Sequence, residues 1–190
     1  IGLTYSIIIK LDEALGDKAL SVIQTDPYKV LELTDTIPFS AIDEVYINSG
    51  GSPYSKRRTA VGLLWSLKKA AVMEGSTGCY SISLKKKFLH LLSFEEKDEN
   101  VYWETLTRLK YSGDIVISEV KGKLNSYEVV FYKKYLDMEE RIAGALHILE
   151  HEGIPNTKKI SKGVIESEIK EAFKSAGLQF KDYPDENNET

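Results

Sequence analysis

The chain has 190 residues, of which 42% are hydrophobic and 28% charged, a composition typical of a soluble folded protein. The formal net charge of −4 argues against a uniformly basic nucleic-acid binder. Cys79 is the single cysteine, so an internal disulfide is excluded and a reducing, cytoplasmic location is predicted. No stretch approaches the roughly 18 apolar residues that a membrane span needs, so no membrane partner is expected.

Short helices joined by turns are predicted for the first part of the chain. Apolar side chains recur at helical spacing over residues 3–15, and Gly16 follows as a stop signal. Asp17 is expected to open a second short helix, and Asp26 to cap a third one that has Pro27 at its first position. The chain therefore begins with tandem helical hairpins.

A tight turn in the stretch "LTDTIPFSAIDEV" separates the third helix from a fourth, which we predict from Ser40 to about residue 48. Ser40 and Asp43 have the spacing of an N-cap and a first-turn acid. Helical hairpins of this kind present backbone N–H groups to an anion, typically a nucleic-acid phosphate. Pro38 occupies the turn, however, and has no N–H to donate.

The pattern changes after the next helix, which is predicted to begin at Pro53 and to stop at Gly75. "GCYSIS" indicates a short strand, "LKKKFLHLL" an amphipathic helix, and "NVYWETLTRLKYSG" another helix with Asn100 as its cap. "DIVISEVKGKLNSYEVVFY" then indicates two strands joined by a turn. Strand, helix, helix and β-hairpin in this order describe a winged helix.

Helices are predicted again over residues 133–151 and 164–176, with a break at Gly153 and Pro155, and the acidic last residues are predicted to be disordered. The expected fold class is mainly α: tandem helical hairpins, a small winged-helix-like module with a β-hairpin, and a C-terminal helical connector. The predicted boundaries are 1–75 for the helix-hairpin-helix-like region, 76–132 for the module, 133–181 for the connector and 182–190 for the tail.

Three stretches follow one another in the sequence: "DPYKV", "IPFSAIDEV" and "EGSTGCY", whose first two residues end a helix. They resemble the helix-hairpin-helix region that precedes the motor in RecD/TraA-type ATP-dependent DNA helicases, the family of the exodeoxyribonuclease V alpha subunit. The resemblance is strongest over residues 2–78 and extends more weakly to about residue 152. It implies a parent protein that unwinds DNA with 5′-to-3′ polarity in recombination or repair, and whose motor domain binds ATP and Mg²⁺.

The sequence departs from that family at the hairpin, where Ile37, Pro38 and Phe39 replace Ile-Gly-Phe. The resemblance therefore implies the fold of the hairpin and not its phosphate contact. No G-x-x-x-x-G-K-[ST] motif occurs in the 190 residues, so they offer no phosphate cradle for ATP. We predict a non-catalytic piece of a longer helicase, without a cofactor of its own, and the start at Ile1 rather than Met agrees with this expectation.

Clusters of Lys and Arg are the candidate nucleic-acid contacts, and single-stranded or forked DNA is the predicted partner. They lie in the first turns of the helix after Pro53, on both module helices and in the wing, which would suit phosphate binding. The alternative is a solvated surface whose charges are paired with acids such as Glu95 and Glu104. The candidates are Lys56, Arg57, Arg58, Lys85, Lys86, Lys87, Arg108, Lys110, Lys121 and Lys123.

Aromatic residues in and after the module could stack on unpaired bases, and core packing is the alternative explanation. Tyr54 and Tyr80 are too isolated in the sequence to be assigned. The residues concerned are Tyr102, Trp103, Tyr111, Tyr127, Phe131, Tyr132 and Tyr135.

The stretch "HILEH" has the residue types and spacing of a zinc site. His147 and His151 share a helix face with Glu150 beside them, as in inverted zinc peptidases, and a third ligand would have to come from Glu166, Glu168 or Glu171. Histidines near a helix C-terminus explain the pattern without a metal. A protein-interaction module without DNA affinity and, as a minor alternative, a zinc hydrolase therefore remain beside the helicase hypothesis.

Overall fold

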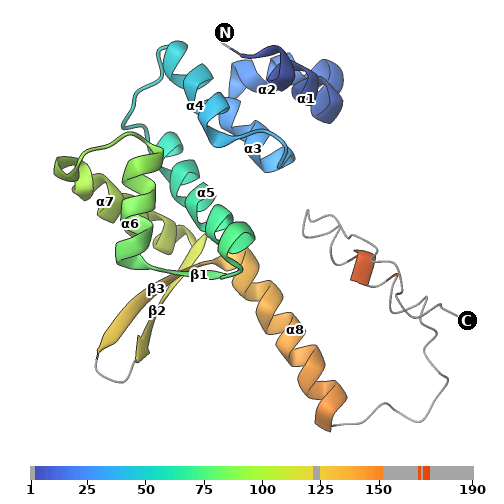
Figure 1. Cartoon of the computed structure of the whole chain (residues 1–190), viewed down its shortest axis with the longest axis vertical. Coiled ribbons are helices and arrows are strands. Elements are labelled where there is room, and N and C mark those ends of the chain that lie inside the picture. The colour runs from blue at the N-terminus through green and yellow to red at the C-terminus, as the bar shows by residue number, and fades with distance from the viewer. Residues whose placement is uncertain (1–2, 122–124, 152–166, 168, 172–190) are drawn as a thin grey trace, which may run out of the picture. The chain divides into compact units, whose positions relative to one another are not determined.

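The computed structural model describes residues 3–121, 125–151, 167 and 169–171. It is mainly helical with one small three-stranded antiparallel sheet, so the predicted fold class is confirmed (Figure 1). Ile1–Ala145 forms one compact unit and Leu146–Thr190 is assigned to a second. Within the described residues, no helix combines the length and apolarity that crossing a membrane requires.

Short helices and sharp stops make up the first part, as the sequence predicts. Gly16 ends the first helix with a φ of +52°, and the Asp26 side chain accepts a hydrogen bond from the Tyr28 N–H beside Pro27. The bounds are Tyr5–Leu15 (α1), Gly16–Lys18 (η1), Ala19–Thr25 (α2), Pro27–Lys29 (η2), Val30–Leu33 (α3) and Phe39–Asn48 (α4).

The start of α4 differs from the prediction. Its N-cap is Pro38, in an extended conformation with φ −71° and ψ 147°, and no side chain caps the helix. Ser40 lies inside the first turn, so its assignment as the N-cap is wrong. The reason is packing, because Phe39 is buried and stacks on Tyr28 with ring centroids 6.0 Å apart, which requires the helix to begin one residue earlier.

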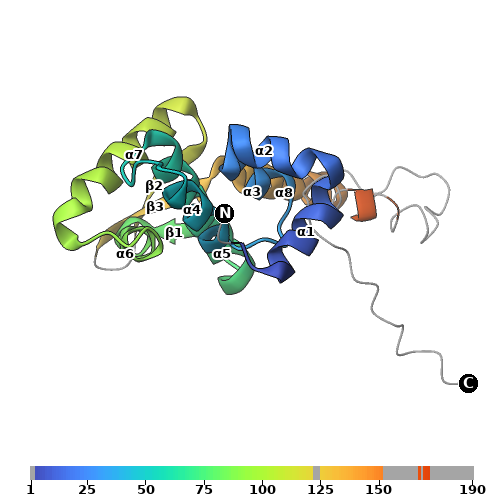
Figure 2. The ribbon, with the colours of Figure 1, turned by 90° about the horizontal axis from the view of Figure 1, so that it is seen from above.

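Helix α5 (Lys56–Glu74) is central to the compact unit. It begins three residues after the predicted Pro53, because the Ser55 hydroxyl caps it by accepting a hydrogen bond from the Arg58 N–H at 3.1 Å. It ends at Gly75, where φ is +66°. In Figures 1 and 2, α5 lies between α1 to α3 on one side and α6 and α7 on the other.

The predicted order of strand, helix, helix and hairpin is present after α5. All three strands pair antiparallel in the order β1-β3-β2. Asn100 is not the cap of α7, because this helix begins at Glu99 with Asp98 at its N-cap, and the capping box of Glu95 and Asp98 belongs to the preceding η3. The bounds are Gly78–Tyr80 (β1), Ser81–Leu91 (α6), Glu96–Asp98 (η3), Glu99–Ser112 (α7), Ile115–Lys121 (β2) and Ser126–Tyr132 (β3).

One hydrophobic core runs through the helical hairpins and the sheet. It includes Tyr28 and Phe39 from the first helices, Leu63 of α5, and Phe88 and Val130 beyond the predicted boundary at residue 75. The first helices and the module are therefore packed together rather than tethered.

Helix α8 (Lys133–His151) follows β3 directly and has the predicted bounds. Most of the later predictions lie outside the described residues: the break at Gly153 and Pro155, nearly all of the last helix, and the tail. Residues 167 and 169–171, inside the predicted last helix, are helical.

Candidate nucleic-acid interface

The hairpin before α4 keeps its apolar anchors and lacks its phosphate donor. Ile37 and Phe39 are buried on either side of Pro38, whose own side chain is exposed. The Pro38 carbonyl accepts a hydrogen bond from the Ala41 N–H at 3.2 Å, but the proline nitrogen has no hydrogen to offer a ligand. The two buried flanking residues explain why the hairpin fold survives the proline.

The three consecutive cations at the start of α5 lie in three different environments. Lys56 is exposed and, among the described residues, forms no ion pair. Arg57 bridges two acids, with Nε 3.0 Å from Asp26 Oδ2 and Nη2 2.8 Å from Glu32 Oε1. Arg58 is only 4% exposed. Successive helical residues point about 100° apart, so a run in the sequence need not form a patch on the surface.

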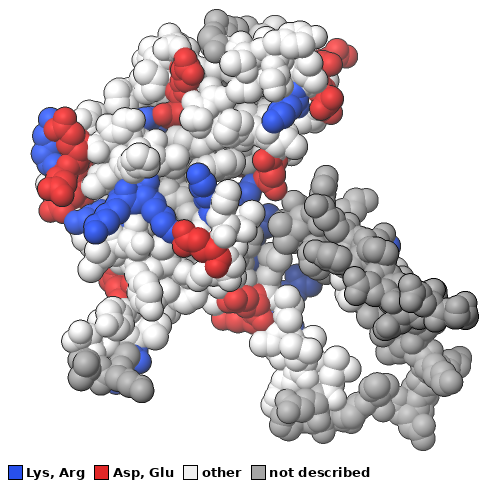
Figure 3. Space-filling view, viewed as in Figure 1, with Lys and Arg blue, Asp and Glu red and all other residues white. Residues whose placement is uncertain are grey.

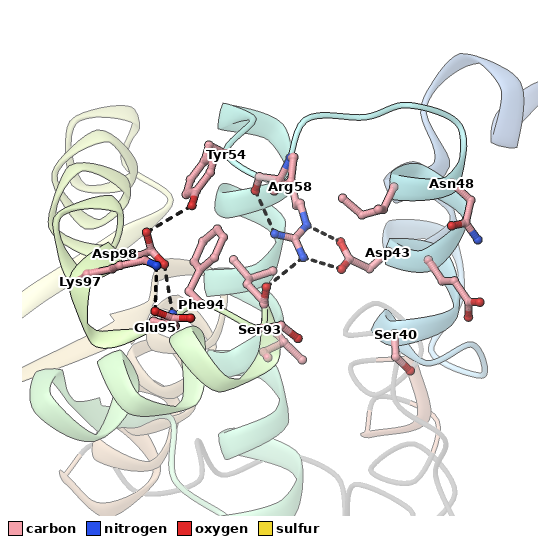
Figure 4. A pocket seen from close by; sticks show the side chains of 15 residues that line it. Ser40, Asp43, Asn48, Tyr54, Arg58, Ser93, Phe94, Glu95, Lys97 and Asp98 are labelled. Carbon is pink, nitrogen blue, oxygen red and sulfur yellow. Dashed lines mark hydrogen bonds and ion pairs between the residues drawn. The ribbon is translucent and has the colours of Figure 1, made fainter.

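Four hydrogen bonds to protein acceptors hold the Arg58 guanidinium. Its Nε and Nη2 donate to the two oxygens of Asp43 at 2.8 and 2.7 Å, as Figure 4 shows. Two further N–H groups donate to the carbonyls of Pro53 at 2.9 Å and Leu92 at 3.1 Å. The same Asp43 accepts a hydrogen bond from the Tyr28 hydroxyl at 2.6 Å. Because its guanidinium is buried and engaged, we leave Arg58 out of the proposed DNA contacts.

The pKa values in this cluster follow from burial and from the Asp43 charge. Burial by itself lowers the pKa of Arg58, but its hydrogen bonds to Asp43 and the attraction of that carboxylate outweigh burial and raise the pKa. Burial, followed by the hydrogen bond to Asp43, raises the pKa of Tyr28 far above its usual value. Arg58 is therefore charged and Tyr28 is neutral at physiological pH.

An open hollow of about 600 Å³, lined in part by Arg58 and Asp43, lies between α4 and the loop before η3 (Figure 4). Its wall includes Phe94, whose ring centroid is 5.4 Å from the Arg58 guanidinium carbon. Carboxylates outnumber cations in its lining, so the hollow does not suit a phosphate. The charged lining residues are Asp43, Glu44, Glu95, Asp98, Arg58 and Lys97.

The three consecutive lysines of α6 also differ in whether they form ion pairs. Lys85 Nζ lies 2.7 Å from Glu99 Oε2, and Lys87 forms an ion pair with Glu74. Lys86, between them, is exposed and has no ion pair within the described part of the chain. Figure 3 shows basic side chains gathered over α6 with acidic ones close by, which agrees with this local pairing.

Helix α7, the second helix of the module, carries both basic and acidic side chains. Arg108 Nη2 donates to the Lys56 carbonyl at 2.9 Å and to the Thr59 hydroxyl at 3.1 Å, so this side chain ties α7 to the start of α5. Lys110 is exposed, and so is Glu104 on the same helix. The structure thus brings Lys56 and Arg108 together.

The wing supplies one described cation. Lys121 ends β2 and is exposed, whereas Lys123 lies outside the described residues. Four of the ten candidates are described lysines with exposed side chains. Their charged nitrogens form neither an ion pair nor a hydrogen bond with another described group. We name them the open lysines: Lys56, Lys86, Lys110 and Lys121.

The aromatic candidates separate into core and surface residues. Tyr102 is fully buried and its hydroxyl donates to the Ser81 carbonyl at 2.9 Å, so core packing explains it. Tyr132 and Tyr135 contact each other with centroids 5.2 Å apart. Tyr111 is 88% exposed, and Tyr127 is half exposed.

The zinc-hydrolase alternative depends largely on residues that the structure does not describe. Within the described part of the chain, no group of three or more His, Cys, Asp and Glu residues could hold a metal ion. The side chains of Glu150 and His151, like Glu166 and Glu168, lie outside that part. Cys79 is buried, and burial raises the pKa of its thiol, which makes it a poor nucleophile.

Comparison with known families identifies the first part of the chain. Residues 1–78 match the family model of the HHH domain of the ATP-dependent RecD2 DNA helicase. This part of the chain is a RecD2-type helix-hairpin-helix domain. No curated protein matches the chain significantly. The RecD2-type domain comprises α1 to α5 and ends at Gly78, the first residue of β1, so the resemblance seen in the sequence is confirmed there.

Proposed function

We propose that the chain is a non-catalytic DNA-binding and scaffold region of a RecD/TraA-type ATP-dependent DNA helicase. The observation that carries the proposal is the RecD2-type domain over residues 1–78. In the parent protein, a motor domain of the same chain would bind ATP and Mg²⁺ and translocate 5′ to 3′ in recombination or repair. The residues considered above have no part in that chemistry.

Two parts of the chain would have different roles, one as a platform and one in DNA contact. The RecD2-type domain would be a rigid platform, because its buried Arg58 and Asp43 pair joins α4 to α5 and its core continues into the module. The module of β1 to β3 has the element order of a winged helix, and the open lysines on its surface and at the start of α5 would contact DNA phosphates. Single-stranded or forked DNA is the expected ligand.

Charge reversal tests this function. We expect the purified chain to bind fluorescein-labelled forked DNA at low salt, measured by fluorescence anisotropy, and the double variant Lys56→Glu/Lys110→Glu to bind it more weakly. Lys97→Glu is the matched control, because Lys97 of η3 is exposed but its Nζ lies 2.8 Å from Glu95 Oε2. Absence of binding by the unmodified chain, or equal binding by the double variant and the unmodified chain, would remove the proposal.

A protein-interaction module without DNA affinity is the second candidate. Its support is the pairing of Arg57, Arg58, Lys85 and Lys87 with acids, together with Pro38 in the hairpin. In that case the chain would not bind forked DNA at low salt. It would bind a separately expressed helicase motor domain, measured by the same anisotropy experiment with the label on the motor domain.

A further inference from the structure

Strand β2 forms one edge of the sheet. In the order β1-β3-β2 it pairs with β3 alone, in an unbroken register from Ile115 with Tyr132 to Lys121 with Ser126. Within the described residues, no strand pairs with its second side. Figure 1 shows the hairpin of β2 and β3 extending away from α6 and α7. We call this unpaired side of β2, over residues 115–121, the free edge.

The backbone of β2 alternates between its two sides. Asp114 precedes β2 and Lys133 follows β3, so these two residues form the next pair of the ladder. The Lys133 N–H donates to the Asp114 carbonyl at 3.0 Å, which makes that pair hydrogen-bonded, and the pairs alternate from there. The N–H and C=O groups of Ile117 and Glu119 therefore point away from β3. Among the described groups, none forms a hydrogen bond with them.

Exposure shows which part of the free edge another molecule can reach. Ile115 is only 2% exposed and Ile117 is half-buried, whereas residues 118–121 are exposed. Edge strands are commonly protected by proline, by a bulge, by charges or by a covering element. β2 has no proline, and its seven pairs are consecutive, so charge is the protection that it carries. Donors and acceptors that alternate at this spacing fit the backbone of another extended segment.

Two carboxylates of like charge lie opposite each other beside the free edge. Glu119 pairs with Glu128, in a position of the ladder where facing side chains approach closely and like charges are destabilising. Neither glutamate forms an ion pair within the described part of the chain. Lys121 is on the same side, two residues further on, and offsets one of the two charges. A cation on a strand added next to β2 would lie beside Glu119 and relieve the repulsion.

The opposite side of β2 is uncharged. Val116 is half-buried, Val120 is 45% exposed, and Ser118 lies between them. Side chains of an added strand would alternate between the two sides in the same way. The complement of the free edge is therefore an extended segment that has a basic residue on the side of Glu119 and apolar residues at the positions before and after it.

We propose that the free edge binds such an extended segment of a protein partner as a fourth strand of the sheet, with a basic side chain beside Glu119 and apolar side chains on the side of Val120. Backbone hydrogen bonds to Ile117 and Glu119 would supply affinity, and the two side-chain preferences would supply selectivity. The inference goes beyond the proposed DNA contacts and does not depend on them.

Two other occupants fit the free edge less well. A nucleic acid would bring phosphates to Glu119 and Glu128. A second copy of β2, paired antiparallel, would bring its Lys121 to Glu119 only in the register centred on Val120, in which residues 119–121 are the only described part of β2 that pairs. A basic segment of a different protein can meet the whole accessible edge, and self-association becomes an outcome of the test.

A labelled peptide of matching pattern tests the proposal. The probe is Val-Thr-Val-Lys-Val-Thr-Val, in which lysine and the threonines share one side of an extended chain and the valines share the other. Fluorescence anisotropy at about 0.1 M salt measures its binding to the purified chain. We expect binding, and exchange of the probe lysine for glutamate should weaken it about 5-fold or more, because a like charge then lies beside Glu119.

Two substitutions at one position separate the backbone from the charge. Glu119→Gln keeps the outward N–H and should remove most of the preference for the lysine probe. Glu119→Pro removes that N–H while keeping the hydrogen bonds to β3, and should abolish binding of both probes, with circular dichroism to check its fold. Glu104→Gln is the matched control and should have no effect, because it removes one exposed acid from α7 and changes the net charge equally.

Hydrogen exchange followed by NMR gives a second readout that needs no variant. In the chain alone, the amides of Ile117 and Glu119 should exchange fast, and the Ser118 amide, which faces β3, should exchange slowly. The lysine probe should slow exchange at Ile117 and Glu119 and leave Ser118 unchanged. This alternation distinguishes strand addition from binding to the side chains alone.

Each contrary result has a distinct meaning. Slow exchange at Ile117 and Glu119 at every protein concentration, without the probe, would mean that the edge is already covered and would overturn the proposal. Protection that rises with protein concentration alone would assign the edge to a second copy instead. Equal affinity for the lysine and glutamate probes would overturn the basic partner. Absence of both binding and protection would overturn strand addition, and none of these results bears on the binding of forked DNA, which is measured separately.

Discussion

Arg58 of α5 and Asp43 of α4 face each other fork to fork, with two hydrogen bonds of 2.8 and 2.7 Å. Both side chains lie under the surface, with relative exposures of 5% and 13%. Tyr28 donates to the same carboxylate, and the Leu92 carbonyl accepts from the same guanidinium. One buried ion pair thus joins the helical hairpins, the long central helix and the loop after α6.

Removing Arg58 should be costly for folding. Arg58→Ala leaves Asp43 buried without its counter-charge, and breaking a buried pair in this way costs about 3–5 kcal/mol. We expect a loss of this order in the free energy of unfolding, measured by urea denaturation. Arg57→Ala is the neighbouring control, because Arg57 is 42% exposed and its pairs with Asp26 and Glu32 should contribute no more than about 1 kcal/mol. Equal losses in the two variants would contradict the structure.

Tyr102 should make the protein sensitive to alkali. Burial raises its pKa to about 12, whereas an unfolded tyrosine titrates near pH 10. Because the folded state keeps the proton longer, this stabilisation is complete below about pH 10 and is lost as pH rises from there to about 12, by at most about 1.4 kcal/mol per pH unit.

The variant Tyr102→Phe isolates that contribution. It should be less stable than the unmodified chain at neutral pH, because the hydrogen bond to the Ser81 carbonyl is lost. The difference should shrink as pH rises above about 10, since phenylalanine does not ionise. Urea denaturation at a series of pH values measures this difference, and a gap that stays constant with pH would argue against a raised pKa.

Gly78 and Gly144 should respond in opposite directions to substitution by alanine. A Cβ on Gly78 would lie 2.5 Å from Phe131 Cε1 and 2.8 Å from Val129 Cγ1, so Gly78→Ala should cost about 1–3 kcal/mol through overpacking. A Cβ on Gly144 would meet no atom within 4 Å, and Gly144→Ala should gain up to about 1 kcal/mol in α8. Thermal unfolding followed by circular dichroism compares them. A stabilised Gly78→Ala would show that β1 is not held against β3 as described.

The order of elements could be predicted from the sequence because it is encoded locally. Gly16 and Gly75 end their helices as expected, and alternation identified the hairpin of β2 and β3. Helix starts were less predictable. Phe39 enters α4 because its ring packs on Tyr28, a contact between residues eleven positions apart that no local signal encodes.

The candidate site was less predictable than the fold, because ion pairing depends on tertiary structure. Nothing in the run Lys56, Arg57 and Arg58 indicates that the third member meets Asp43, fifteen positions away, while the first faces solvent. Tyr80 could not be assigned from the sequence either, since its partner Tyr127 comes from a strand far along the chain. The one usable signal was strand alternation, which already separated Tyr127 from Glu128.

Lys86 and its neighbour Lys85 offer a matched test of which cations contact DNA. If binding releases counterions, the logarithm of the affinity for a single strand falls with the logarithm of salt concentration by about 0.7 per phosphate contact. Lys86→Gln should make that slope shallower by about one such step. Lys85→Gln should change it less, because Lys85 already lies 2.7 Å from Glu99. The measurement is a salt titration of oligo(dT) anisotropy for both variants. Identical slopes in the two would mean that the ion pairs of α6 open on binding, and a steeper loss in Lys85→Gln would exclude Lys86 as a phosphate contact.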